Sequence, residues 1–391
     1  MRQVLFDLSV LRTGARTRGI GRYVASLGEA LASEAQAYPG LELTGLEALS
    51  YSGASSTSGD MVAAIARLAS APRESHAAWA YRLRLTLART TRKLRPDLLH
   101  QGHPNATPLG KLRCPRVVTA HDLIPLRYPD RYLDYRDGWY PGRLRLDHRR
   151  YASADHVIAI SETTANDLVT LLGISPKKIS VVYNGVDLRL WTPEPEGQDR
   201  SVRDRFALSD KVYALYVGAG DWRKNFDGML SAVIRARRLA PELDLVLAWA
   251  AELDEGTRGR IAARLAEAGA PGAVQLLGYV SDAELGSLMR GAAAQLFVSR
   301  AEGFGYPVVE AMAAGCPVIT SDLSSMAEVA ADAAITVDPE DHAAIARALV
   351  TLADSATERR RYSAAGVARA RHFSIQRMAR GTLDVYESLT R

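Results

Sequence analysis

Short apolar runs alternate along this chain with longer segments in which apolar residues recur every three or four positions. The short runs predict buried strands, and the longer segments predict helices that pack on one side. The expected strands of the first half are Gln3–Asp7, Leu98–His100, Val117–Ala120, His156–Ile160 and Ile179–Val182. Those of the second half are Tyr213–Val217, Leu243–Ala248, Val274–Leu277, Ala294–Val298, Val318–Thr320 and Ile335–Val337. Because strands that alternate with helices form parallel sheets covered on both faces, the sequence predicts an α/β fold.

The segment Trp191–Gly197 separates the two halves. Its two prolines and its polar composition are typical of a linker, and 391 residues exceed the length of one typical domain. We therefore expect an N-terminal domain of residues 1–190 and a C-terminal domain of residues 191–373. A terminal segment, residues 374–391, is expected to form a last helix from about Ile375 to Leu389.

Composition indicates a cytoplasmic globular protein. Hydrophobic residues make up 47% of the chain and charged residues 24%, and no apolar run reaches the roughly 18 residues that suggest a membrane span. The run Val4-Leu5-Phe6 is too short for a signal peptide. Cys114 and Cys316 fall in different expected domains, so neither a disulfide framework nor a thiolate metal site is predicted.

Positive charge is concentrated in the first half, with a net charge of +9 for residues 1–190 against −4 for the remainder. One cluster comprises Arg82, Arg84, Arg89, Arg92, Lys93 and Arg95, and it alternates with Trp79, Leu83, Leu87 and Leu94 at helical spacing. Such a helix can lie on an anionic membrane surface. The alternative is a solvated helix face packed by its leucines. No nucleic-acid-binding motif accompanies the charge, so nucleic acid is not an expected partner.

The segment Ser299–Asp322 combines a buried strand end, a turn with two glycines and a short helix expected over Val308–Ala314. Glu302 lies in the turn and Glu310 in the expected first turn of the helix. A strand, loop and helix in this order aim unpaired backbone N–H groups and the positive helix end at a bound anion. The two glutamates can accept hydrogen bonds from the hydroxyls of a polyol. Acidic residues are also common in first turns for electrostatic reasons alone.

The residues from Glu302 to Ile319, E-G-F-G-Y-P-V-V-E-A-M-A-A-G-C-P-V-I, resemble the E-x7-E signature of the retaining glycosyltransferases of family 4. The resemblance implies the GT-B fold, in which two Rossmann-like β/α/β domains face each other across an interdomain cleft and the last helix returns to the first domain. It implies a hexosyltransferase that uses a nucleoside-diphosphate sugar. Glu302 would then bind the donor sugar and Glu310 the ribose. The remaining donor-binding residues in this segment would be Gly303, Phe304, Gly305 and Val308.

A second turn, Tyr216–Asn225, resembles a dinucleotide fingerprint in which Arg223 replaces the third glycine. This substitution weakens a nicotinamide interpretation. In family 4 the corresponding basic pair, Arg223 and Lys224 here, stabilises the departing diphosphate. The chain has no Asp-x-Asp triplet, so we expect no cofactor and no metal. The resemblance also places Val280, in the segment G-Y-V, against the nucleobase.

The first domain is expected to bind the acceptor. Gly19 and Gly21 follow the first strand, in a loop expected over residues 12–21, and resemble the family's glycine loop near the donor phosphates. His121 follows another strand, where the family places a histidine near the reacting carbon of the sugar. Asp122 either orients this imidazole or caps the next turn. The turn Asn184–Asp187 is interpreted as structural, with a contribution to a hinge left open.

The predicted reaction is transfer of a hexose to an acceptor hydroxyl with retention. The segments F-D-L-S, G-I-G-R-Y and H-D-L-I-P-L-R-Y-P resemble bacterial enzymes of O-antigen and surface-polysaccharide synthesis, which favours mannose or a related deoxyhexose from a GDP-sugar and a lipid-linked acceptor. The basic helix would then contact the inner face of the membrane. Arg127 and Arg131 could lie near an anionic acceptor. Alternatives are a soluble acceptor such as an aglycone or a sugar phosphate, a nucleotide-sugar epimerase, and a non-catalytic sugar-nucleotide-binding protein.

Overall fold

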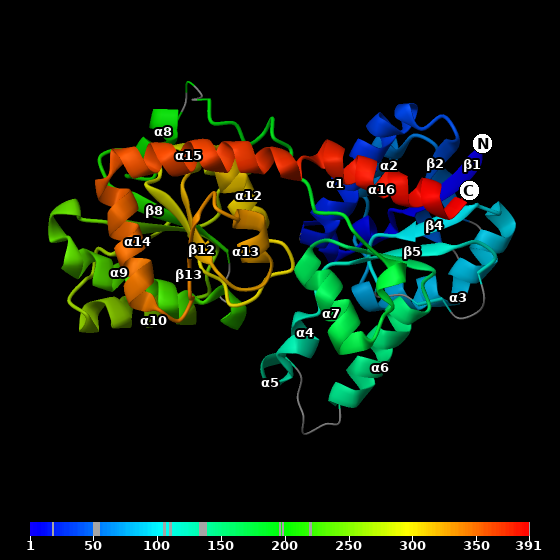
Figure 1. Ribbon diagram of the computed structural model, residues 1–391, viewed down its shortest axis with the longest axis horizontal. Coiled ribbons are helices and arrows are strands. Elements are labelled where there is room, and N and C mark those ends of the chain that lie inside the picture. The colour runs from blue at the N-terminus through cyan, green and yellow to red at the C-terminus, as the bar shows by residue number, and fades with distance from the viewer. Residues whose placement is uncertain are drawn as a thin grey trace. The chain divides into compact units, whose positions relative to one another are not determined.

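The computed structural model describes the chain except for residues 18, 50–54, 105–106, 109–111, 133–138, 195–196, 198, 219–220 and 391. The chain forms two compact units. Unit 1 comprises Met1–Gly185 together with Ile375–Arg391, and unit 2 comprises Val186–Ser374. Each unit contains one sheet with helices around it (Figure 1).

Unit 1 is built on a seven-stranded sheet in the order β3-β2-β1-β4-β5-β6-β7. All neighbouring pairs are parallel except β2 with β3. The central strands β4, β5 and β6 are buried almost throughout, as expected for strands covered on both faces. The strands are β1 (Arg2–Asp7), β2 (Leu41–Leu49), β3 (Ser55–Ser58), β4 (Leu98–Gln101), β5 (Arg116–Ala120), β6 (His156–Ala159) and β7 (Ile179–Val181).

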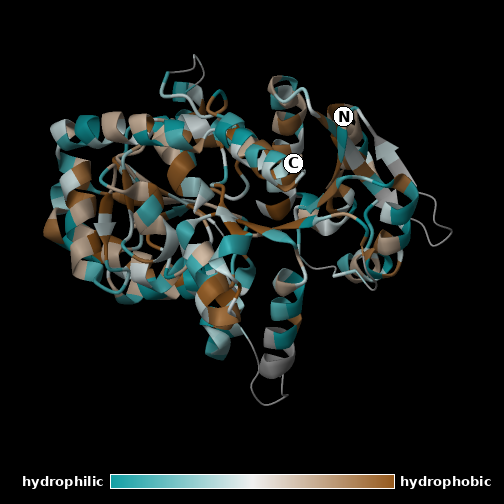
Figure 2. Ribbon diagram, turned by 45° about the vertical axis from the view of Figure 1, so that its right-hand side comes forward, coloured by the Kyte–Doolittle hydropathy of each residue, from teal (hydrophilic) through white to brown (hydrophobic). Residues whose placement is uncertain are grey.

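The helices of unit 1 are α1 (Gly19–Glu34), α2 (Met61–Ser70), α3 (His76–Leu94), α4 (Ile124–Arg127), α5 (Pro129–Tyr132), α6 (Trp139–Ala152), α7 (Glu162–Leu172) and α16 (Ile375–Thr390). Local chemistry defines several of their ends. Ser161 accepts a hydrogen bond from the backbone of Thr164 at the start of α7, and Gly173 ends that helix in the left-handed conformation. Figure 2 shows polar and apolar residues alternating around the helices, the pattern of helices that bury one side.

The last helix, α16, packs in unit 1 beside α1 (Figure 1). Its Met378, Leu383 and Tyr386 belong to the same core as β1 and α1. The Tyr386 hydroxyl lies 2.5 Å from His100 Nδ1, and His100 Nε2 lies 2.8 Å from Thr119 Oγ1. A buried polar chain thus joins the end of the sequence to β4 and β5.

Unit 2 is built on a six-stranded sheet in the order β10-β9-β8-β11-β12-β13, parallel throughout. The strands are β8 (Tyr213–Val217), β9 (Val246–Ala250), β10 (Val274–Leu276), β11 (Ala294–Phe297), β12 (Val318–Ser321) and β13 (Ile335–Val337). The helices are α8 (Asp199–Arg205), α9 (Phe226–Leu239), α10 (Glu255–Glu267), α11 (Asp282–Gly291), α12 (Tyr306–Ala313), α13 (Ser324–Ala330), α14 (His342–Asp354) and α15 (Ala356–Ala370). A 3₁₀ turn, η6 (Trp222–Lys224), follows β8.

The structure differs from the sequence-based expectations at several elements. The strands β2 and β3 were not predicted. The helix α1 begins at Gly19 and not near Arg22, and the strand expected from Leu243 begins at Val246 because residues Pro241–Leu243 form a 3₁₀ turn. The expected linker lies within unit 2, partly on residues outside the described set, whereas the two units meet in sequence between Gly185 and Val186.

Among the residues that the structure describes, no helix is both long enough and apolar enough to cross a bilayer.

Candidate active site

The loop after β8 presents two cations at the carboxyl end of the unit 2 sheet. Asp221 accepts a hydrogen bond from the Arg223 backbone N–H and so begins η6. Asn225 ends the turn in the left-handed conformation with φ of 55°. Its fully buried amide donates to the carbonyls of Val298 and Pro339, at 3.2 and 2.7 Å. Asn225 therefore fixes the turn that carries Arg223 and Lys224.

Glu302 receives both cations. Arg223 Nη1 lies 2.5 Å from Glu302 Oε2, and Lys224 Nζ lies 2.6 Å from Glu302 Oε1. The Glu302 side chain is 10% exposed and that of Lys224 is 15% exposed, so both charges are largely removed from water. The structure thus brings together three residues that the sequence assigned to one site, although Lys224 and Glu302 are far apart in the chain.

The Lys224 ammonium is largely buried, and burial disfavours its charged form. Burial is the main influence on its pKa and lowers it, and the Arg223 charge acts in the same direction. Glu302 opposes both by direct charge pairing. The ammonium also lies 4.6 Å from the centroid of the Phe297 ring, where the ring face attracts a cation.

Arg300 supports the same turn from the strand β11 side. Its backbone N–H donates to the Arg223 carbonyl at 2.7 Å, and its guanidinium donates to the Trp222 carbonyl at 2.9 Å. A further bond from Arg300 Nε to Glu340 fixes the guanidinium, at 2.5 Å. Arg300 and Asn225 are positioning residues that sequence reasoning did not single out. In the sequence, only their positions beside Lys224 and Glu302 could have indicated a role for Asn225 and Arg300.

The loop that carries Glu302 is tied to the start of α13. The Glu302 backbone N–H donates to Ser324 Oγ at 3.1 Å, and Ser325 Oγ donates to the Glu302 carbonyl at 2.9 Å. Gly305 has a φ of 97°, and a Cβ there would come within 2.1 Å of Met326 Cε. The left-handed backbone conformation therefore favours glycine at position 305, and a larger residue would also displace the end of the Met326 side chain.

Other predicted donor-binding residues fall into different environments. Glu310 is the fifth residue of α12, beyond the first turn where it was expected, and is 3% exposed. Phe304 packs its ring on Tyr306 and Phe373. The Val308 side chain is fully buried and its N–H bonds the Gly305 carbonyl at 3.0 Å, so it offers a donor no free amide. Val280 lies just before α11.

Two buried hydroxyls near the cation loop have no hydrogen-bond partner among the described residues. These are Tyr216 Oη, on β8, and Ser299 Oγ, two residues beyond β11. Both side chains are fully buried. Unsatisfied buried hydroxyls are costly and suggest that water or a ligand completes the site.

In unit 1, His121 follows β5 and donates from Nε2 to the Gly102 carbonyl, at 2.7 Å. This bond assigns the proton of the neutral ring to Nε2 and leaves Nδ1 as an acceptor. Burial lowers the pKa of His121 to about 4. Of the two roles left open for Asp122, the structure shows the cap: Asp122 Oδ1 accepts from the Ile124 backbone N–H at 3.2 Å.

The two N-terminal glycines lie within α1 and not in a loop. A Cβ on Gly21 would come within 2.3 Å of the Ala15 carbonyl oxygen, whereas Gly19 has open space around the same position. Close packing against the preceding turn therefore explains Gly21. Arg127 donates from Nε and Nη2 to Asp167 Oδ1, at 3.0 and 2.5 Å. Arg127 is thus paired with Asp167, and its contact with an anionic acceptor stays a prediction.

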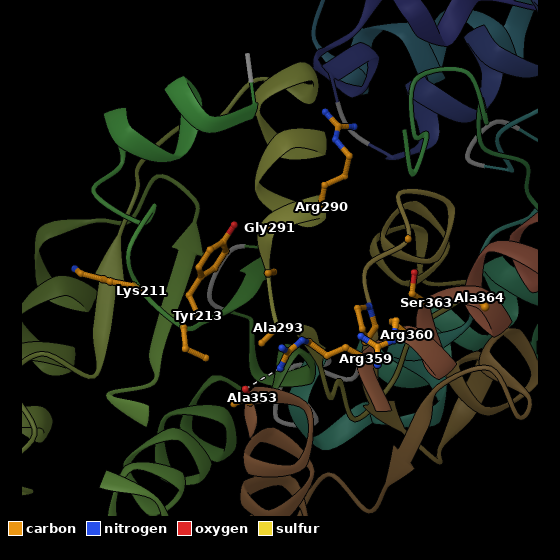
Figure 3. Close-up of a pocket in the computed structure, with 14 residues that line it drawn as sticks. Lys211, Tyr213, Arg290, Gly291, Ala293, Ala353, Arg359, Arg360, Ser363 and Ala364 are labelled. Carbon is orange, nitrogen blue, oxygen red and sulfur yellow. Dashed lines mark hydrogen bonds between the residues drawn. The ribbon is translucent and has the colours of Figure 1, made fainter. Parts of the chain in front are cut away.

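Figure 3 shows residues that line a pocket in unit 2, at the amino-terminal edge of the sheet. Its volume is about 490 Å³. Arg359 donates to the carbonyls of Leu352 and Ala353 at the end of α14. Arg290 forms two bonds with Asp199, at 2.7 and 2.6 Å. Arg359 therefore satisfies a helix end and Arg290 a carboxylate, and none of the donor-site residues lines this cavity.

Two family models together match most of the chain. The family model described as "Glycosyl transferases group 1" matches residues 198–369, and that described as "Glycosyltransferase Family 4" matches residues 17–190. The O-antigen chain mannosyltransferase B of Escherichia coli is 28% identical over 275 residues, 70% of each chain. The MMP alpha-(1->4)-mannosyltransferase of Mycolicibacterium hassiacum is 32% identical over 308 residues, 74% of this chain and 70% of that one.

Solved structures show the same fold. Anabaena HepE, in complex with UDP and glucose, has a TM-score of 0.70 at 16% identity and covers 100% of both chains. WaaG, a glycosyltransferase involved in lipopolysaccharide biosynthesis, has a TM-score of 0.67 at 15% identity, over 98% of this chain and 99% of that chain. The fold is thus GT-B. The chain belongs to the family 4 glycosyltransferases, enzymes of the hexosyltransferase class that transfer a sugar from a nucleotide sugar.

Proposed function

We propose that this enzyme transfers mannose or a related deoxyhexose from a GDP-sugar to an acceptor hydroxyl, with retention, in surface polysaccharide or glycolipid synthesis. The two mannosyltransferase relatives favour mannose. The glycogen synthase of Mycobacterium tuberculosis, 26% identical over 324 residues, and the UDP complex of HepE favour a glucose donor and uridine instead. The donor is therefore the first property to test.

The observation that carries the proposal is the contact of Glu302 with both Arg223 and Lys224 at the carboxyl ends of the strands. This is the edge of a parallel sheet at which α/β proteins bind ligands. We assign nucleotide-sugar binding to unit 2, Val186–Ser374, and acceptor binding to unit 1. The unpartnered hydroxyls of Tyr216 and Ser299 support a ligand in unit 2.

In this mechanism, the bond between the sugar's anomeric carbon and the diphosphate oxygen breaks, and a bond to the acceptor oxygen forms. The acceptor proton passes to the departing diphosphate. Arg223 and Lys224 stabilise the negative charge that develops on that leaving group. Glu302, released from part of its pairing when the diphosphate arrives, accepts hydrogen bonds from the donor sugar.

The remaining residues position the substrates. Glu310 binds the ribose hydroxyls, Val280 contacts the base, and the amides of Gly303, Phe304 and Gly305 approach the sugar and phosphates. His121 faces the sugar as a neutral imidazole, and the helix start at Gly19 and Gly21 approaches the phosphates. Val308 contributes by shaping the start of α12. The basic pair supplies the charge that a divalent ion would otherwise provide, so we expect transfer to continue in the presence of a chelator.

A thermal-shift panel over GDP, UDP, ADP and TDP tests the donor site. A nucleotide at 100 times its dissociation constant stabilises the folded protein by about 2.7 kcal/mol. We expect one base to give the largest shift and Lys224→Met to abolish it. Lys211→Met removes an exposed lysine from the same unit and should preserve the shift. Equal shifts in both variants would refute the assignment of Lys224.

Glu302→Gln should reduce transfer by about a hundredfold, the scale of one lost electrostatic contact.

We further propose that the enzyme is cytoplasmic and contacts the inner face of the membrane through α3, where it meets a lipid-linked acceptor. No described ion pair neutralises Arg89, Arg92, Lys93 or Arg95. Tyr81 and Leu85 on the same helix are 61% and 40% exposed. Sedimentation with vesicles of anionic and of neutral lipid distinguishes this acceptor from a soluble one.

A further inference from the structure

Unit 1 contains a cavity of about 170 Å³ beside His121. It lies where β4 and β5 end, and α1, α4 and α6 also contribute to its wall. Its polar and apolar lining includes Ile20, His103, His121, Asp122, Asp147 and Arg150. At about 30 Å³ per water, the volume corresponds to roughly five or six water molecules. The cavity is therefore large enough for one sugar ring and too small for an extended chain.

Arg150 provides a buried donor with no partner. The residue is 9% exposed, and its Nη1 donates to Asp147 Oδ1 at 2.5 Å. Its Nε is buried and has no hydrogen-bond partner among the residues that the structure describes. A guanidinium N–H that is removed from water and left unsatisfied is costly, because it loses its hydration without replacement. A hydrogen-bond acceptor bound in the cavity would satisfy this N–H.

The two histidines of the cavity are neutral groups. His103 is 7% exposed, and its ring centroid lies 5.6 Å from that of Trp79 and 6.5 Å from that of His121. Burial lowers the pKa of His103 well below its usual value, and the charge of Arg150 acts in the same direction. His121 donates to Gly102 from Nε2, so its Nδ1 is an acceptor. The cavity thus offers both a donor and an acceptor without added positive charge.

The charges that line the cavity disfavour an anion. Arg150 is already shared with Asp147, and Asp122 adds a second carboxylate. A phosphate or carboxylate in this space would therefore meet a net negative lining in a poorly solvated setting. A hydroxyl group both donates and accepts, and it matches the lining without a charge penalty.

We propose that this cavity binds one uncharged sugar ring of the acceptor, whose hydroxyls accept from Arg150 Nε and donate to His121 Nδ1. This inference rests on the proposed function, because only a sugar-transferring site beside His121 needs an acceptor ring there. Arg150, with its charge paired to Asp147, would then favour neutral acceptor rings over anionic ones. Sugar phosphates and uronic acids are excluded as the acceptor ring.

Saturation-transfer NMR tests the inference with methyl α-D-mannopyranoside, methyl α-D-glucopyranoside and their 6-phosphates, each with the nucleoside diphosphate that gives the largest thermal shift. We expect at least one neutral glycoside to bind and its 6-phosphate to bind at least about tenfold more weakly. Arg150→Met should weaken the neutral glycoside by about tenfold or more, the scale of a hydrogen bond to a charged group. The matched control is Arg149→Met, at the exposed neighbouring arginine, which should leave binding of the neutral glycoside unchanged.

Ile20→Phe provides a second variant that reduces the cavity without breaking the Arg150–Asp147 pair, and it should also weaken the glycoside. Equal binding of the 6-phosphate, or unchanged binding in both cavity variants, would overturn the inference. So would the absence of any glycoside binding while the nucleotide still binds. Displacement of the glycoside by the nucleotide sugar in the slow Glu302→Gln variant would assign the cavity to the donor. Absence of all nucleotide binding would instead contradict the proposed function.

Discussion

Glu302 is held by two cations in a largely desolvated site. Burial disfavours the charged form of Lys224 and lowers its pKa, and the Arg223 charge acts in the same direction. Glu302 opposes both effects by pairing with the ammonium before any diphosphate binds. The Glu302 carboxylate offsets the repulsion between the like charges of Arg223 and Lys224. The donor therefore meets a preorganised site.

Asn225 is the residue on which this arrangement depends most directly. We expect Asn225→Ala to lower the free energy of unfolding by about 2–3 kcal/mol, because two buried carbonyls lose their donor. Asn225→Gly loses the same bonds but accepts the left-handed backbone conformation, so it should be less destabilised than Asn225→Ala by about 1 kcal/mol. Urea unfolding measures both. Wild-type stability in the alanine variant would show that the two bonds are unimportant.

For single residues, the sequence predicts which side chains belong to the site better than it predicts which side chains they contact. Arg223, Lys224 and Glu302 were identified because they match family 4 motifs and because each follows a predicted strand, and parallel strands end at one edge of a sheet. Asn225 and Arg300 were not identified, because an amide or guanidinium that supports a turn resembles any polar residue after a strand. The Arg150–Asp147 pair and the capping role of Asp122 likewise depend on packing that no local pattern encodes.

The helix α3 carries basic residues on its exposed side. Residues 76–95 include six basic residues and no acidic residue. Arg89 lies three and four positions before Arg92 and Lys93, where like charges destabilise a helix by roughly 0.2–0.5 kcal/mol per pair. The buried side of α3 is different, with Trp79, Leu83 and Leu87 in the core of unit 1. The packed leucine face is therefore confirmed, and contact of the basic side with an anionic membrane stays a prediction.

We expect the wild-type protein to sediment with vesicles that contain anionic lipid and not with neutral vesicles. Replacing Arg89, Arg92 and Lys93 together by glutamine should weaken binding roughly a hundredfold, since each basic residue near such a surface contributes about 1 kcal/mol. A triple glutamine variant at Lys211, Arg360 and Arg361 carries the same charge change on unit 2 and serves as the control. Equal losses in both variants would indicate a net-charge effect, and no binding by the wild type would favour a soluble acceptor.

The missed strand β2 shows why element prediction was incomplete. Its sequence includes Gly45, Glu42 and Glu47, which are poor signals for a strand. The structure explains two of them. A Cβ at Gly45 would come within 2.7 Å of Leu8 Cδ1, and Glu47 is paired with Arg67 at 2.8 Å. Tertiary packing therefore overrides local preference at this strand, whereas the apolar strands β5 and β11 were evident from sequence.

Across unit 1, buried histidines make stability dependent on pH. Burial lowers the pKa of His100 to about 3 and that of His121 to about 4, and it lowers that of His103 as well. In the unfolded chain each takes up a proton near its ordinary pKa of about 6.5. The stability that these neutral rings contribute is thus fully present above pH 6.5 and is lost as the pH falls toward 4.

We expect the free energy of unfolding to decrease on acidification below about pH 6.5, by up to about 1.4 kcal/mol per pH unit for each buried histidine. Chemical denaturation between pH 7 and 4.5 measures this slope. His121→Gln should reduce it, whereas His148→Gln, at an exposed position, should leave it unchanged. A slope that is unaffected by His121→Gln would show that this ring does not remain neutral in the folded protein.

For the whole molecule, the two α/β sheets and the family were accessible from sequence because apolar periodicity and the E-x7-E segment are both local patterns. The discontinuity of unit 1 was suggested only by resemblance. No local signal in Ile375–Thr390 identifies the sheet on which that helix packs. Its contacts with α1 and His100 arise between residues at opposite ends of the chain.

The position of α16 has a consequence for synthesis. A ribosome must complete all of unit 2 before the residues that finish unit 1 emerge. Until then, the surface that Met378, Leu383 and Tyr386 cover remains open to water, and His100 lacks its tyrosine partner. The first domain to be translated is therefore the last to be completed, and the nascent chain carries an apolar surface that folding factors can recognise throughout most of its elongation.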